Sequence, residues 1–369
     1  MEIPFLRPRL VALADYANLI EQIDASRLYS NFGPLNTRFE QRVVAEQFDG
    51  VGAAATVCNA TLGLMLAIQA VKRPGRYAVM PSFTFAATPL AAQWCGLEPY
   101  FIDVGADWCV DPLQLKEALA HLGDAVAVVL PYATFGTALE LAPYAALIER
   151  GVPVVVDAAP ALGTRCAEQG FGVGFKGPIV YSLHATKTFG IGEGGLVYSG
   201  DDAIVRKVKT LSNFGFDAGR TSRLTGLNAK LSEYGAAVAL ATLDGHSNRV
   251  ALRRDLYGEY AANFDQLGLF AAGWQLQALR GEVAHQFVPA ATPSALTNAK
   301  AITRLASKSI EARTYFSPAC HAQPQFAAAP RASLAVTDDL AHRIVSLPLW
   351  DDIGAQRIRR VCEALVTVG

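Results

Sequence analysis

Short apolar runs alternate with helix-like segments over about the first 245 residues of the chain. The apolar runs predict strands at Ala54–Cys58, Tyr77–Met80, Pro99–Val104, Ala125–Leu130, Pro153–Val156, Ile179–Leu183 and Gly195–Tyr198. The runs Val126–Leu130 and Val152–Val156 contain only apolar residues, which is typical of strands buried on both faces. Strands that alternate with helices build a mainly parallel sheet. The predicted fold is therefore α/β, with a seven-stranded, mainly parallel sheet sandwiched by helices.

Local signals place two helix ends within this part of the chain. Asp111 and Pro112 are typical of an N-cap followed by the first helical residue. The segment Leu139–Arg150 is predicted to be a helix that ends before Gly151, since glycine often adopts the left-handed conformation after a helix.

After about residue 245 the pattern changes, and strands and helices no longer alternate regularly. A long polar-faced helix is predicted to open this part of the chain with Arg249, Arg253, Arg254 and Tyr257. One hydrophobic core seldom serves a chain of this length throughout. We therefore predict a large domain over residues 1–245 and a smaller α+β domain over residues 246–369, which ends in a helix around Ile353–Val366.

Composition narrows the class of protein. The chain has 369 residues, of which 51% are hydrophobic and 18% charged, and its 32 Lys and Arg nearly balance its 33 Asp and Glu. Such a balance argues against a protein that binds nucleic acid by neutralising phosphates. High hydrophobicity with low net charge likewise argues against a disordered chain.

The segment Tyr77–Leu97 has 21 residues without a charge, which is long enough to cross a bilayer. Pro81 and Pro89 would interrupt a spanning helix, so we interpret the segment as a strand, a loop and the start of a buried helix. The first residues show no basic region followed by an apolar one, so we expect no secretion signal, and the six cysteines show no CxxC spacing. We expect a soluble cytoplasmic protein with reduced thiols, without a bound metal and without a membrane partner.

The residues after each strand matter most, because open α/β sheets bind ligands beyond the carboxyl ends of their strands. The first predicted strand is followed by Asn59, Ala60 and Thr61 at the start of an apolar helix. Free backbone amides there would suit a phosphate, although an ordinary helix cap explains these residues equally well. Phe85, after the second strand, could stack on a flat ligand, and core packing is the alternative.

Two charged residues follow later strands. Asp157 ends an apolar run, where a buried carboxylate needs a cationic or hydrogen-bonding partner, although it could simply cap the next turn. Lys187 follows the strand Ile179–Leu183 in a segment with little other charge. Burial lowers the pKa of a lysine amine and makes it a nucleophile for carbonyls, whereas a surface lysine in a Gly-rich loop is the alternative.

Two glycine clusters match the dinucleotide-binding pattern GxGxxG: Gly172-Gly174-Gly177 and Gly190-Gly192-Gly195. That pattern binds a pyrophosphate only where it follows a strand and opens a helix. Both clusters lead into apolar strands instead, which argues against a nicotinamide-dependent oxidoreductase.

The candidate residues together fit pyridoxal phosphate (PLP). Ala60, Thr61 and Ser182 would hold the phosphate, Phe85 the ring, Asp157 the pyridine nitrogen, and Lys187 would bind the cofactor covalently. The order of these groups along the chain, each at the end of a strand, favours one site over unrelated residues.

Longer segments resemble the DegT/DnrJ/EryC1/StrS family of sugar aminotransferases over nearly the whole chain. Tyr181–Asp201 (YSLHATKTFGIGEGGLVYSGD) is similar to the family's cofactor-lysine segment and is the most specific match. Val154–Thr164 is similar to the motif of its pyridine-binding aspartate, and Cys58–Ile68 to its phosphate-binding turn. Further segments resemble other landmarks of the family: Ser30–Glu40, Gly226–Asp244, Ala312–His321 and Val345–Trp350.

The resemblance implies fold type I of the PLP enzymes and a role for each matching residue. Lys187 would be the cofactor lysine and proton shuttle, with Asp157 on the pyridine nitrogen, Phe85 against the ring, and Ala60, Thr61 and Ser182 on the phosphate. Asn228 matches the position from which a partner subunit reaches the phosphate, which implies a homodimer with shared active sites. Where the family commonly has a glutamine that bonds the cofactor's phenolic oxygen, this chain has Pro160. Either another group or a water serves there, or the electronic properties of the lysine-bound cofactor differ.

The resemblance implies an aminotransferase. It would move an amino group from an amino acid, with glutamate as the first candidate, to a keto-sugar linked to a nucleotide. The alternatives are a cyclitol-type ketone as acceptor and a non-catalytic protein on the same fold, which would have no need of Lys187. Four further residues have open roles: Arg220, Arg223 and Lys230 are either diphosphate contacts or solvated loop charges, and His184 either touches substrate or braces its loop.

Overall fold

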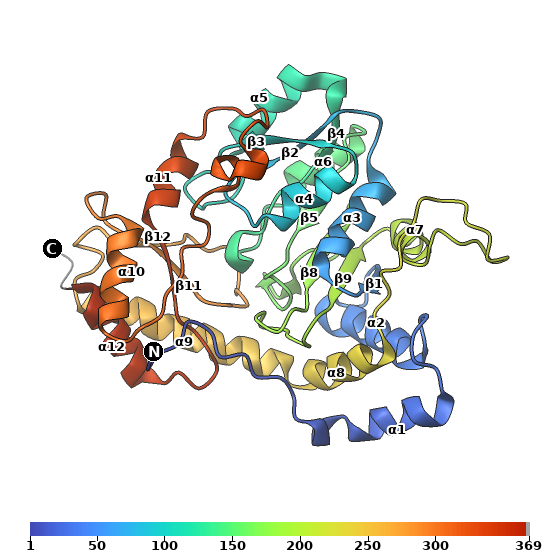
Figure 1. The fold of residues 1–369 in the computed structure, drawn as a ribbon, viewed down its shortest axis with the longest axis horizontal. Helices are drawn as coiled ribbons and strands as arrows, with labels where there is room; N and C mark the ends of the chain where they lie inside the picture. Colours follow the sequence, from blue (N-terminus) through green and yellow to red (C-terminus); the bar gives the residue numbers. More distant parts are fainter. Residues whose placement is uncertain (367–369) are drawn as a thin grey trace.

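The computed structural model describes residues 1–366 and contains a large sheet at its centre (Figure 1). Its strands are β1 (Ala53–Val57), β2 (Tyr77–Pro81), β3 (Glu98–Ile102), β4 (Val126–Val129), β5 (Val156–Asp157), β8 (Ile179–Ser182) and β9 (Gly195–Ser199). One ladder has the order β3-β2-β4 and another the order β5-β8-β9-β1. Parallel bridges from Val129 to Val154 and from Tyr132 to Asp157 join the two ladders into one sheet.

The prediction of a mainly parallel sheet is confirmed, with β9 as the antiparallel member. β9 pairs antiparallel with both β8 and β1, while the other neighbouring pairs run parallel. The reason is local, because the connection between β8 and β9 contains no helix to return the chain to the other end of the sheet.

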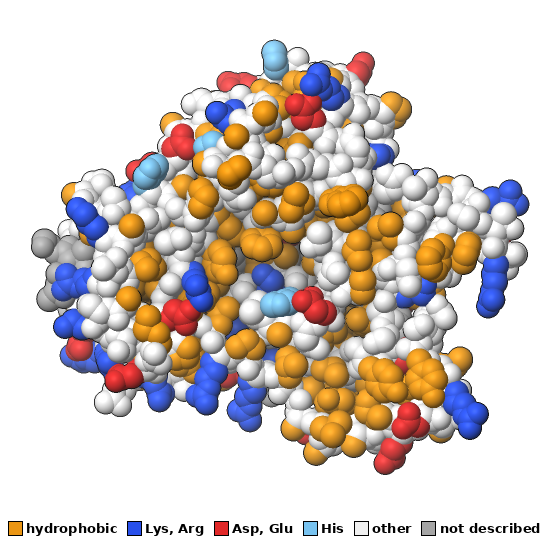
Figure 2. Space-filling model, viewed as in Figure 1, with side chains coloured by type: hydrophobic (Ala, Val, Ile, Leu, Met, Phe, Trp, Pro, Cys, Tyr) orange, Lys and Arg blue, Asp and Glu red, His pale blue; other side chains and the backbone are white. Residues whose placement is uncertain are grey.

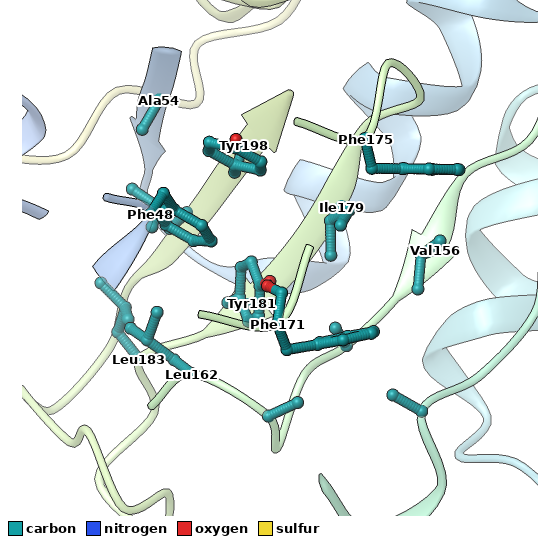
Figure 3. Packing of buried hydrophobic residues seen from close by; sticks show 14 of the residues in the cluster. Phe48, Ala54, Val156, Leu162, Phe171, Phe175, Ile179, Tyr181, Leu183 and Tyr198 are labelled. Carbon is teal, nitrogen blue, oxygen red and sulfur yellow. The ribbon is translucent and has the colours of Figure 1, made fainter. Parts of the chain in front are cut away.

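Helices cover both faces of the sheet. They are α2 (Pro34–Gln47), α3 (Ala60–Val71), α4 (Ala87–Trp94), α5 (Pro112–Leu122), α6 (Ala142–Glu149), α7 (Asp202–Ser212) and α8 (Glu233–Asp244). Alternate strand residues belong to two separate hydrophobic clusters: Tyr181 packs with residues of α2, α5, α6 and α8, and Val180 with residues of α3, α4 and α7. On the first face Phe48 stacks on Tyr198 with ring centroids 3.8 Å apart (Figure 3).

The predicted helix ends are confirmed in one case and shifted in the other. Asp111 caps α5 by accepting hydrogen bonds from the amides of Leu113 and Gln114. α6 begins at Ala142 and not at Leu139, because Pro143 belongs in the first helical turn, where its missing N–H costs no hydrogen bond. Gly151 follows this helix with a positive φ of 77°, as expected.

A second, smaller sheet lies in the C-terminal part of the chain. It has the antiparallel order β10-β11-β12, formed by Gln275–Leu276, Val288–Ala291 and Ile344–Leu347. The surrounding helices are α9 (His246–Gln266), α10 (Asn298–Ser307), α11 (Ala335–Arg343) and α12 (Ala355–Val366), and α9 and α12 correspond to predicted helices. Ile3 from the chain start joins the hydrophobic cluster of this part. The domain division at residue 245 stays a prediction.

The uncharged segment from Tyr77 forms β2, a loop and α4, as predicted. Within residues 1–366, no helix is both long and apolar enough to pass through a membrane. All six cysteines are free. In the same range no group of three or more His, Cys, Asp or Glu side chains is arranged to hold a metal ion. The cytoplasmic location stays a prediction.

Candidate active site

The structure places Asp157 at the carboxyl end of β5 and Lys187 in the loop after β8, within electrostatic reach of each other. Burial of the Lys187 amine lowers its pKa to about 8, and the negative charge of Asp157 acts in the opposite direction. A lysine with this pKa is partly neutral near pH 8, so its amine is a competent nucleophile and base.

Hydrogen bonds hold the buried carboxylate of Asp157, which is 2% exposed. The hydroxyl of Thr88 donates to Oδ2 at 2.5 Å, and the amide of Ala159 donates to Oδ1 at 3.0 Å. Burial raises the pKa of Asp157, while these two bonds and the nearby Lys187 counteract the rise. Thr88 is a site residue that the sequence patterns did not indicate, although it stands only three residues after Phe85.

Gln286 is the second residue that the sequence reasoning missed. The amine of Lys187 donates a hydrogen bond of 3.0 Å to its side-chain oxygen Oε1. Gln286 lies two residues before β11, nearly one hundred positions after the lysine, and no local motif marks it.

The register of three neighbouring strands brings the predicted phosphate residues together. Gly195 of β9 pairs with Val57 at the end of β1 on one side and with Ser182 of β8 on the other. The side chain of Asn59 accepts from the amide of Leu62, which leaves the amides of Ala60 and Thr61 at the open end of α3. These amides and Ser182 therefore lie around Gly195.

Gly195 leaves space beside the amides at the start of α3, because it has no side chain. A Cβ atom at Gly195 would lie 2.8 Å from the amide nitrogen of Ala60, so a larger residue would occupy the space beside the helix terminus. Free amides at a helix N-terminus suit a phosphate. With a buried carboxylate and a lysine of lowered pKa at neighbouring strand ends, the residues present fit PLP.

Phe85 lies at the rim of a cavity of about 750 Å³. Its side chain is 56% exposed, and its ring centroid is 6.2 Å from that of Phe316. Phe85 and Thr88 belong to one turn, in which the amide of Thr88 donates a hydrogen bond to the carbonyl of Phe85. The side chain of Thr88 reaches Asp157 from this turn. The face of the molecule drawn in Figure 2 is hollowed near its centre, and hydrophobic side chains border the hollow.

Asn228 points away from the backbone bond that its neighbour makes beside the predicted phosphate residues. It is exposed on the segment between α7 and α8, which extends from the body of the molecule (Figure 1), and its Oδ1 accepts from Lys230. Its neighbour Ala229 accepts from the amide of Cys58, just before the phosphate turn. The segment thus returns to the candidate site at Ala229, near its C-terminal end.

Three of the four residues with open roles have local side-chain partners. Arg223 pairs with Asp217, Lys230 donates to Asn213, and Arg220 is exposed. His184 contacts Thr186 through Nδ1 at 2.8 Å, which is a bracing contact within its loop. Neither glycine cluster opens a helix, since Gly177 is followed by β8 and Gly195 begins β9, so the structure lacks the setting of a nicotinamide site at both places.

Known proteins of the same fold share this arrangement of strands and helices over nearly the whole chain. A solved structure from Bacillus cereus ATCC 10987, classed as a PLP-dependent aminotransferase, is 46% identical, with a TM-score of 0.97 over 98% of this chain and 99% of its own. DesI, solved with its TDP-sugar product, is 32% identical, with a TM-score of 0.88 over 99% of this chain and 93% of its own. The dTDP-4-amino-4,6-dideoxy-D-glucose transaminase of Escherichia coli is 25% identical over 99% of this chain and 98% of its own.

The family model described as "DegT/DnrJ/EryC1/StrS aminotransferase family" matches residues 13–366. This range includes both sheets, the buried Asp157, Lys187, and Ala60 of the predicted phosphate site. Family and structural neighbours imply PLP as the cofactor. The chain therefore belongs to the DegT/DnrJ/EryC1/StrS aminotransferase family.

Proposed function

We propose that this protein transfers an amino group from glutamate to a keto-sugar that is linked to a nucleotide. The observation that carries the proposal is the amine of Lys187 within electrostatic reach of the buried carboxylate of Asp157. Thr88 bonds both that carboxylate and the backbone of Phe85, and Phe85 lines the cavity. Two relatives support the acceptor class, since one was solved with a TDP-sugar product and the other is a dTDP-amino-sugar transaminase.

Bound PLP supplies an electron-withdrawing ring that stabilises negative charge beside the amino group being moved. Asp157 would hold a proton on the ring nitrogen, since its carboxylate is buried and hydrogen-bonded by Thr88. The amine of Lys187 would first bind the cofactor and then, once free, take and return the proton of the donor's α-carbon. Its pKa of about 8 allows both actions near neutral pH.

The cavity beside Phe85 is our candidate for the acceptor site. Its lining combines the aromatic rings of Phe85, Tyr315 and Phe316 with the charged side chains of Glu311 and Arg313. Aromatic faces suit a sugar or a nucleobase, and an arginine suits a diphosphate. Arg313 also pairs with Glu311, so an anionic ligand would compete with that carboxylate.

A panel of acceptors tests this function. We expect the purified protein with PLP and glutamate to convert at least one keto-sugar nucleotide into an amino sugar, followed by mass spectrometry of the product. Free keto-sugars without the nucleotide are the control and should react at least about tenfold more slowly, because they lack the anionic contacts. Conversion of a cyclitol ketone, but of none of the keto-sugar nucleotides, would contradict the proposed acceptor and support the alternative. A protein that leaves the donor untouched would indicate the non-catalytic alternative.

We further propose a homodimer with shared active sites, in which Asn228 completes the phosphate site of the partner. An exposed apolar area supports the dimer: Leu28 and Tyr29 follow α1 (Ala17–Ser26), and Tyr29 stacks on Tyr234 of α8 with centroids 6.2 Å apart. Figure 2 shows hydrophobic side chains gathered over this region. Exposed apolar areas of this kind often mark a subunit interface.

Subunit mixing tests the shared site. The variants Lys187→Ala and Asn228→Ala should each be strongly impaired. An equimolar mixture of the two should recover about a quarter of the wild-type activity, because about half of its dimers are mixed and each mixed dimer regains one of its two sites. Mixing Lys187→Ala with Asp157→Asn is the matched control. Both of these residues belong to the same half of the site, so no recovery is expected there. Absence of recovery in the first mixture as well would contradict the shared site.

A further inference from the structure

The side-chain amide of Gln286 faces the amine of Lys187. Lys187 donates to Oε1 of Gln286 over 3.0 Å, and Gln286 is only 7% exposed. An amide oxygen can accept an N–H from an ammonium or from a neutral amine, so this contact persists whichever form the lysine takes.

The backbone on the N-terminal side of Gln286 is fixed to the lysine loop. The hydroxyl of Thr188, the residue after Lys187, donates to the carbonyls of Ala284 at 3.2 Å and His285 at 3.0 Å. These bonds tie the chain next to the amine to the chain next to the amide. The side chains of Lys187 and Gln286 thus face each other from two segments that the side chain of Thr188 joins.

A second element braces the same segment from α9. The imidazole of His285 stacks on the ring of Tyr257 with centroids 4.1 Å apart and planes 8° apart. Arg253 donates to the carbonyl of His285 at 3.2 Å, and Asp351 holds the guanidinium of Arg253. Side chains that are locked in this way hold a reacting group more closely than a mobile loop does.

We propose that Gln286 is the positioning residue of Lys187, and that its amide oxygen holds the amine in one place whenever the lysine side chain is free. This inference rests on the proposed function, in which Lys187 must leave and rejoin the cofactor in each cycle. The amine then needs a partner other than the cofactor, because a free lysine side chain has many rotamers. The oxygen of Gln286 restricts this freedom without adding a charge.

The charges around the pair decide how the amine responds to pH. Asp157 is the anion that favours the ammonium form of Lys187. Arg249 approaches from α9, where it donates to the carbonyl of Thr188 and pairs with Asp351. The remaining groups near these segments are neutral at pH 7 or locally paired: Tyr132, His246 and His285, whose shifted pKa values keep them uncharged, and His184, which lies 3.6 Å from Glu193.

The pKa of Lys187 should respond to the residue at position 286. A hydrogen bond from an ammonium is stronger than one from a neutral amine, so the oxygen of Gln286 favours the charged form. Its removal should therefore lower the pKa of Lys187 below about 8, and a carboxylate in its place should raise it.

Competitive labelling of the cofactor-free protein with trace acetic anhydride measures this property. Mass spectrometry of the peptide that contains Lys187 gives the labelling rate at each pH. We expect a midpoint near pH 8 in the wild type, about one pH unit lower in Gln286→Met and about one pH unit higher in Gln286→Glu. Neither donor nor acceptor is present, so the result does not depend on whether the proposed transamination is right.

Gln277→Met is the matched control, since Gln277 is another buried glutamine that bonds the carbonyls of Asp107 and Thr134 and not the lysine. It should leave the midpoint near pH 8. An unchanged midpoint in folded Gln286→Met would overturn the inference. If that variant fails to fold, Gln286→Glu decides, because it keeps an acceptor at the same place, and an unchanged midpoint there overturns the inference equally.

Discussion

Replacement of Lys187 by alanine is expected to abolish transamination, with kcat reduced by about 10⁴-fold or more, because the variant loses both the nucleophile and the proton carrier. The same substitution should remove the visible band of the lysine-bound cofactor. Borohydride treatment of the wild type should then attach the cofactor permanently to the peptide that contains Lys187, as detected by mass spectrometry. The amine is suited to both tasks because burial lowers its pKa to about 8.

This pKa also sets the pH dependence of cofactor uptake. Only the neutral amine attacks a carbonyl, and about a tenth of it is neutral at pH 7 and about half at pH 8. The rate at which the cofactor-free protein takes up PLP should therefore rise with pH and level off above pH 8 to 9. Lys300→Ala, on the exposed surface of α10, is the control and should behave like the wild type. An active, yellow Lys187→Ala variant would refute the assignment.

Asp157→Asn is expected to reduce kcat by about 100- to 1,000-fold, because a neutral amide cannot keep a proton on the ring nitrogen. The substitution also removes the anion that favours the ammonium form of Lys187. The pKa of the lysine should therefore fall below about 8, in the same direction as in Gln286→Met. Steady-state kinetics and the labelling profile of Lys187 measure the two effects separately.

A substitution of Thr88 should weaken the carboxylate of Asp157 without removing it. Thr88→Val keeps the shape of the side chain but removes the hydroxyl that donates to Asp157, so kcat should fall by about tenfold. Thr84→Val is the matched comparison, because the hydroxyl of Thr84 bonds that of Thr88 and not the carboxylate itself, so kcat should fall less than in Thr88→Val. Full activity of Asp157→Asn would contradict the role of the carboxylate, whatever the threonine variants do.

The amino-acid pattern was sufficient to predict those strands and helix ends that are set by residues close together in the sequence. Apolar runs such as Val126–Leu130 become strands because both faces of the sheet are covered, and Asp111 caps α5 with its own side chain. α6 begins three residues after the predicted start at Leu139, because the apolar pattern does not show where Pro143 can lie in a helix. The direction of β9 likewise followed from the absence of a crossover helix and not from its composition.

Some residues of the candidate site could be predicted from the sequence, and others could not. Asp157 and Lys187 could be found in the sequence, since each is a charge at the end of an apolar strand and parallel strands end at one edge of a sheet. Thr88 and Gln286 could not, because a threonine in a helix and a glutamine in a loop are ordinary surface residues until the fold buries them. Their catalytic and positioning roles stay predictions for the experiments above.

The sequence by itself determined the α/β class, the positions of the strands and the family, because all of these follow from the order of residues along the chain. Only the tertiary structure decided what surrounds the lysine. It brings Gln286 within 3.0 Å of an amine 99 residues away, and it sets the exposure that lowers the lysine's pKa. Both depend on contacts between distant segments, here the bonds of Thr188 and Arg253 to the backbone before β11, which no local pattern of residues encodes.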